Sequence, residues 1–263
     1  MKKLLIASVW SIFFFSFLGS GLLHADSIFV EVPAGAVLLN EFKAPVLLFV
    51  PQTFKESEPR AMLIVMPSSS YDKKLFEEWQ PLAEKNRWVL MIPSVLILNG
   101  EVPYKMDEWL DKVKHAMMLR YGIKKVFLIG LGMNAHYAGY LGLKDSKFAD
   151  AVACVGGSWV GPYDKITSLS TNVKKQTPFF IAIQEKDKLV AETQAKTKTM
   201  TEEGYSVRLV MLDKENEEHT EKFRSEMMGW LEERAASAAI RKQENQKTVK
   251  EKISTAVETF FAV

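Results

Sequence analysis

The residues with the clearest chemical implication stand where a buried apolar run ends in a short glycine-rich segment. Val126–Ile129 carries β-branched and aromatic residues and no charge, which is typical of a strand buried on both faces of a parallel sheet. Gly130-Leu131-Gly132-Met133-Asn134 follows, and small residues then continue at a helical spacing. A strand, a tight turn and a helix form the context of a nucleophile elbow, G-x-S-x-G, which presents a reactive hydroxyl. The segment contains no serine, so the context of this chemistry is present without its reactive atom.

The stretch resembles the elbow of the α/β-hydrolase superfamily, with two departures. Gly132 stands where the family places its nucleophilic serine, and Asn134 stands where the family closes the turn with glycine. The resemblance implies an oxyanion hole built from the backbone N–H of Met133 and from the loop that begins at Ser68 and Ser69. The same loop also suits an ordinary turn with helix capping.

The resemblance also implies positions for an acid and a histidine, because the superfamily orders its triad as nucleophile, acid and histidine. Asp187 matches the acid position, and it also suits a helix N-cap. His219 matches the histidine position after the last strand, although its acidic neighbours are equally typical of a surface loop. His115 lies within a predicted helix and His136 just past the elbow, so chain order selects His219.

A glycine at the elbow changes what this frame can do. Loss of the nucleophile alone costs on the order of 10⁶ in kcat in a well-studied serine protease. Glycine also relaxes the strained backbone of the turn, which costs roughly 1–3 kcal/mol with a side chain. The first hypothesis is therefore a non-catalytic protein that binds a small ligand or a protein partner through the former cleft.

Two other hypotheses remain open at the level of the sequence. One is an active serine hydrolase that uses another hydroxyl, for which Ser68, Ser69, Ser70 and Ser158 are available. The other is a structural periplasmic protein that assembles through its C-terminal helix.

The order of elements predicts an α/β fold with a mostly parallel sheet and helices on both faces. Predicted strands alternate with predicted helices, except that the first two strands have no helix between them and could form an antiparallel edge. The predicted strands are Ser27–Val32, Val46–Val50, Ala61–Met66, Trp88–Ile92, Val126–Ile129, Ala151–Val155, Pro178–Ile183 and Ser206–Leu212. Helical patterns fill the gaps, including Val190–Glu203 and Thr220–Glu233.

The first 25 residues have the pattern of a secretory signal peptide. Lys2 and Lys3 precede an apolar stretch from Leu4 to Leu23, and Ala25 suits a cleavage point. The alternative is an uncleaved membrane anchor, since the stretch is about as long as a membrane span of ~20 residues. We therefore predict an exported protein, periplasmic or secreted, with contact to a membrane only if the leader stays in place.

The composition limits the partners of the rest of the chain. Outside the leader, which holds two lysines and no acid, the chain carries 32 basic and 32 acidic residues and offers no electrostatic case for nucleic acid. Cys154 is the only cysteine, so no intrachain disulfide forms, and its strand-like surroundings indicate a buried apolar role.

The remaining sequence divides into a predicted hydrolase-like domain at residues 26–234 and a helical extension at residues 235–263. The extension is alanine-rich, then charged, and ends in apolar residues, so it suits either a helix folded back onto the domain or a docking helix. No metal-ligand spacing, P-loop or complete G-x-G-x-x-G motif is present, and the sequence predicts neither a metal nor a cofactor.

Overall fold

The computed structural model describes residues 35–39, 45–52, 61–68, 73–94, 106–156, 177–214 and 217–237. All of them belong to one compact unit, residues 31–263. The predicted leader, the predicted strand at Ser27–Val32, Ser69, Ser70, Ser158 and residues 238–263 lie outside the described residues.

Eight strands form one sheet in the order β1-β2-β4-β3-β5-β6-β7-β8. β1 pairs antiparallel with β2, β2 pairs antiparallel with β4, and every other pair is parallel. The strands are β1 (Ala36–Leu39), β2 (Val46–Phe49), β3 (Ala61–Met66), β4 (Val89–Pro93), β5 (Lys125–Leu131), β6 (Ala151–Val155), β7 (Phe179–Gln184) and β8 (Val207–Leu212). The predicted mostly parallel sheet with an antiparallel edge is confirmed, and its outermost strand within the described residues is β1, which the sequence analysis does not predict.

The central strands are buried on both faces, which explains their continuous apolar sequences. β3 and β6 are buried at every position, and the predicted bounds of both are confirmed. A parallel strand covered by helices on both sides has no solvent-facing side chains, so its sequence does not alternate. Cys154 lies in β6 with no exposed surface, and burial raises the pKa of its thiol, as expected for an inert apolar role.

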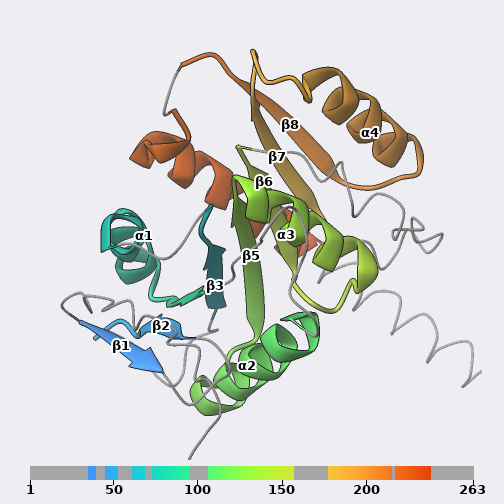
Figure 1. Ribbon diagram of the computed structural model, residues 1–263. Coiled ribbons are helices and arrows are strands. Elements are labelled where there is room, and N and C mark those ends of the chain that lie inside the picture. The colour runs from blue at the N-terminus through green and yellow to red at the C-terminus, as the bar shows by residue number, and fades with distance from the viewer. Residues whose placement is uncertain are drawn as a thin grey trace, which may run out of the picture. The chain divides into compact units, whose positions relative to one another are not determined.

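The helices cover the sheet in two groups with separate cores. α2 (Met106–Tyr121), α3 (Met133–Lys144) and α4 (Val190–Glu202) pack on one face. α1 (Lys73–Asn86) and the helix at residues 221–237 pack on the other. In Figure 1, α1 and the orange-red helix lie on one side of β5 and β6, and α3 lies on the other. Ala235 is buried in the second core, so the predicted domain boundary at 235 falls inside a continuous helix.

We predict that the fit of α3 against the sheet makes Gly142→Ala destabilising. A Cβ atom at position 142 would lie 2.9 Å from side-chain carbons of Phe179 and Val152. Overpacking of this kind typically costs about 1–3 kcal/mol. Chemical denaturation of the purified protein measures the change in the free energy of unfolding.

Gly229→Ala is the matched control, because Gly229 also lies within a helix but nothing stands within 4 Å of its added Cβ. Alanine is the better helix former by about 1 kcal/mol, so this variant should be neutral or more stable. Equal losses in both variants would contradict the packing at Gly142.

Candidate functional site

The turn at Gly132 has the backbone geometry that the sequence predicts for an elbow. β5 ends at Leu131 and α3 begins at Met133, so a single residue connects them. Gly132 has φ 53° and ψ −122°, a conformation that residues with a side chain rarely adopt. Its N–H donates to the carbonyl of Val155 at 2.8 Å, which fixes the turn to the end of β6.

The first and last positions of the motif also take part in close packing. A Cβ atom on Gly130 would lie 2.2 Å from the backbone oxygen of Asn134, so glycine is required where β5 passes under α3. The side-chain amide of Asn134 is buried and donates to the carbonyl of Pro67. This hydrogen bond attaches the chain that leaves β3 to the first turn of α3.

Ser68, which follows Pro67, lies directly against the turn. A Cβ atom placed on Gly132 would lie 2.7 Å from the Cβ atom of Ser68, closer than two non-bonded carbon atoms approach. The volume of a nucleophile's side chain is therefore already taken by Ser68. Met133 is the first residue of α3, directly after this turn.

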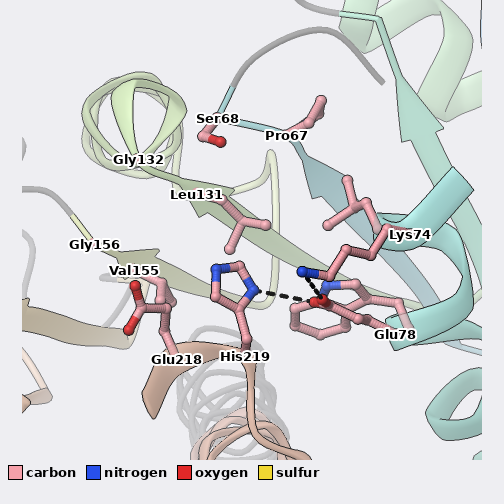
Figure 2. A pocket seen from close by; sticks show the side chains of 12 residues that line it. Pro67, Ser68, Lys74, Glu78, Leu131, Gly132, Val155, Gly156, Glu218 and His219 are labelled. Carbon is pink, nitrogen blue, oxygen red and sulfur yellow. Dashed lines mark hydrogen bonds and ion pairs between the residues drawn. The ribbon is translucent and has the colours of Figure 1, made fainter. Parts of the chain in front are cut away.

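A pocket of about 220 Å³ opens at the carboxyl ends of β3, β5 and β6, next to α1. Figure 2 shows that its side chains come from these strand ends, from α1 and from the 3-10 helix η2 (Glu217–His219). Its apolar lining residues are Pro67, Leu75, Trp79, Leu131 and Val155, its glycines are Gly132 and Gly156, and its polar groups are Ser68, Lys74, Glu78, Glu218 and His219. Gly132 and His219, which the sequence predicts to share a site, line this one pocket.

His219 is held by an acid that the sequence does not predict. Its Nδ1 lies 3.2 Å from Oε2 of Glu78, a residue of α1. The guanidinium of Arg224 lies 3.4 Å from the same oxygen and also donates to the backbone carbonyl of His219. Arg224 is buried, and this desolvation lowers its pKa, while the Glu78 and Glu221 carboxylates raise it. These contacts hold the imidazole in the pocket.

Asp187 takes the alternative role that its sequence position suggests. Its Oδ1 accepts a hydrogen bond from the Leu189 N–H at 2.8 Å, which orders the turn that leads into α4. Asp187 does not line the pocket, and within the described residues it makes no hydrogen bond to His219. In this structure the acid that contacts His219 is Glu78 of α1, while Asp187 makes the turn contact before α4.

Helical spacing in the sequence could have identified Glu78 and Arg224. Glu78 lies three residues after Leu75 and one before Trp79, on the side of α1 that faces the core. Arg224 lies next to Phe223 and three residues before Met227, on the buried stripe of its helix. A charged residue on an apolar stripe signals a buried partner.

Comparison with known proteins gives no match among protein-family models and no match among curated proteins. Solved structures do match. A thermostable esterase superposes with a TM-score of 0.58 at 16% identity, over 77% of this chain and 64% of that chain. Esterases from Rhizomucor miehei superpose with a TM-score of 0.59 at 9% identity, over 80% and 86%. The S-formylglutathione hydrolase of Staphylococcus aureus superposes with a TM-score of 0.53 at 11% identity, over 80% and 99%.

The chain has the α/β-hydrolase fold. At these identities the similarity establishes the fold, and activity must be argued from the pocket itself. The chain spans less than two thirds of the thermostable esterase.

Within the described residues, no three His, Cys, Asp or Glu side chains gather as a metal site. Among the same residues, no helix is both long and apolar enough to cross a bilayer.

We predict that Glu78→Gln destabilises the protein, because it leaves the buried guanidinium of Arg224 without its carboxylate. The side chain of Glu78 is only 15% exposed, so loss of a charged hydrogen-bond partner should cost about 1–3 kcal/mol. Urea unfolding measures this loss. Glu77→Gln, on the exposed side of α1, is the control and should stay within about 0.5 kcal/mol of wild type. Equal losses of unfolding free energy in Glu78→Gln and Glu77→Gln would contradict the Glu78–Arg224 contact.

We also predict that His136 makes the protein less stable in mild acid. Burial in the first turn of α3 lowers the pKa of His136, while the Asp187 carboxylate acts in the opposite direction. The unfolded chain binds a proton below a pKa of about 6.5, before the folded chain does, so stability should fall as the pH drops below that value.

Thermal unfolding at pH 7.5 and 5.5 tests this effect. The drop in Tm between the two pH values should be smaller in His136→Gln than in wild type. His115→Gln is the control, because that side chain is exposed on α2. A drop in Tm in His136→Gln as large as in wild type would contradict the assignment of the acid sensitivity to His136.

Proposed function

We propose that this is an exported, non-catalytic protein of α/β-hydrolase fold that binds a small ligand in the former active-site pocket. The proposal rests on the conformation and the residue type of the turn at Gly132. The backbone has the conformation of an elbow, yet the residue at its tip has no atom that can attack a substrate. The export follows from the leader pattern of residues 1–25.

The surroundings of Gly132 support the loss of the nucleophile. The Cβ atom of Ser68 stands 2.7 Å from where a side chain would begin, and the Asn134 amide attaches the preceding residue, Pro67, to α3. The two departures from the motif are therefore linked: glycine at 132 makes room for Ser68, and asparagine at 134 holds that loop in place.

The pocket supports retained binding. It keeps a cavity of about 220 Å³ with apolar walls and several convergent polar groups, which is the usual composition of a small-molecule site. His219 stays oriented by Glu78 and Arg224, although no nucleophile stands at the elbow for it to activate. A buried charge pair of this kind is costly to maintain, which argues that the imidazole still has a binding role.

The position of Ser68 favours a second candidate, an active hydrolase. Ser68 and His219 line the same pocket, so Oγ of Ser68 could attack an ester carbonyl while Nε2 of His219 takes the hydroxyl proton. His219 would pass that proton to the departing alcohol, and water would then release the acid from acyl-Ser68. The third hypothesis, assembly through the C-terminal helix, concerns a segment that lies mainly outside the described residues.

A fluorophosphonate probe, which labels activated serines, separates these candidates. We expect no labelling of the purified protein without its leader, because no hydroxyl stands at the elbow. We also expect none in Gly132→Ser, whose new Cβ meets Ser68. The double variant Gly132→Ser, Ser68→Gly removes the obstructing carbon and should gain labelling, since Glu78 and His219 then face a serine.

Labelling of the wild-type protein that disappears in Ser68→Ala would instead establish the second candidate. Circular dichroism and unfolding curves on each variant show that it is folded before its labelling is compared.

A further inference from the structure

The hydrogen-bonding role of the His219 imidazole in the pocket is fixed by the groups behind it. The carboxylate of Glu78 has acceptor atoms only, and Oε2 faces both Nδ1 of His219 and the Arg224 guanidinium. In a neutral imidazole that contacts a carboxylate, the proton lies on the ring nitrogen that faces the carboxylate. Nδ1 of neutral His219 therefore carries the proton and donates it to Glu78.

Nε2 of His219 is then a hydrogen-bond acceptor. Figure 2 shows the ring with Nδ1 turned to Glu78 and Nε2 turned away from it. Within the described part of the chain, Nε2 has no hydrogen-bond partner, and the side chain of His219 is 45% exposed along the pocket. A ligand in this pocket thus meets a lone pair at Nε2.

Glu218 adds a second acceptor to the same pocket. Its Oε2 accepts a hydrogen bond from the amide of Gln184 at 2.8 Å. A carboxylate can accept about four hydrogen bonds, so Gln184 leaves capacity for a ligand. The ammonium Nζ of Lys74 lies 4.0 Å from Oε1 of Glu78, and the Lys74 side chain is 80% exposed, so this cation belongs mainly to the outer, solvent-facing part of the lining.

We infer that the pocket selects a small apolar molecule that carries a hydroxyl or an ammonium group, which donates to Nε2 of His219 and to Glu218. Leu75, Trp79 and Leu131 supply the apolar wall for its body. The cavity of about 220 Å³ is below the usual range of about 300–1,000 Å³ for drug-sized ligands, so a body of one ring is the appropriate size. This inference rests on the proposed binding function and names its ligand class.

The selection is opposite to that of an esterase pocket. An oxyanion hole offers N–H donors to a carbonyl oxygen, whereas the groups identified here offer acceptors to an O–H or N–H. A carbonyl or a carboxylate brought against Nε2 and Glu218 would leave acceptors facing acceptors, without a hydrogen bond between them.

The first test is the tautomer of His219 in the wild-type protein. Long-range ¹H–¹⁵N spectra of protein labelled at histidine distinguish a proton on Nδ1 from a proton on Nε2. We expect the Nδ1–H tautomer at neutral pH, and its signals are assigned by their absence in His219→Phe. A dominant Nε2–H tautomer would overturn the inference.

The second test uses four probes with one benzyl-sized body. Benzyl alcohol and benzylamine carry donors, and acetophenone and benzoate carry only acceptors. We expect the two donor probes to shift the Nε2 resonance saturably and to bind about tenfold more tightly than the acceptor probes, as loss of one hydrogen bond implies. His219→Phe should remove most of this difference, and His115→Phe on the exposed side of α2 should leave it unchanged.

The outcomes separate this inference from the function on which it rests. Tighter binding of acetophenone or benzoate would leave ligand binding in place and overturn the donor preference alone. Absence of saturable binding by all four probes would also overturn the inference. Fluorophosphonate labelling of the wild-type protein would contradict the non-catalytic function itself.

Discussion

The close approach of three chain segments at the carboxyl ends of β3, β5 and β6 is the constraint on which the rest of the site depends. Gly130 brings β5 under α3, the Gly132 N–H fixes the turn to Val155, and Ser68 fills the space above it. Neither Gly130 nor Gly132 tolerates an added Cβ atom without movement of a neighbour. The turn therefore has the backbone geometry of an elbow as a packing arrangement, with no side-chain atom at residue 132.

The cluster of Glu78, Arg224 and His219 depends on two helices that pack on the sheet face opposite α3. Glu78 comes from α1 and Arg224 from the helix at residues 221–237, and both helices pack on the core that covers that face. The side chains of Glu78 and Arg224 extend to the carboxyl ends of the strands, where they contact His219 of η2. Because the core fixes both helices, the imidazole has a defined orientation without help from the loop after β7. The Asp187 carboxylate meanwhile accepts a hydrogen bond in the turn before α4.

Much of the fold follows from local pattern alone. Continuous apolar runs such as Ala61–Met66 and Ala151–Val155 locate buried strands, because a strand covered on both faces needs apolar residues at every position. The alternation of strands and helices then predicts the parallel sheet. The edge strand β1 is not among the predicted strands, although its four residues, AVLL, are all apolar.

The sequence by itself determined the strand–turn–helix context at Gly132, the absence of a nucleophile there, and the position of His219 after the last strand. Those features depend on residues close together in the chain, where spacing and side-chain type are sufficient. Only the tertiary structure decided which acid holds His219 and what fills the space above Gly132. Glu78 lies 141 positions from His219, and Ser68 follows β3 whereas Gly132 follows β5. Such contacts are set by how the helices and strands pack on one sheet, and local pattern does not encode that packing.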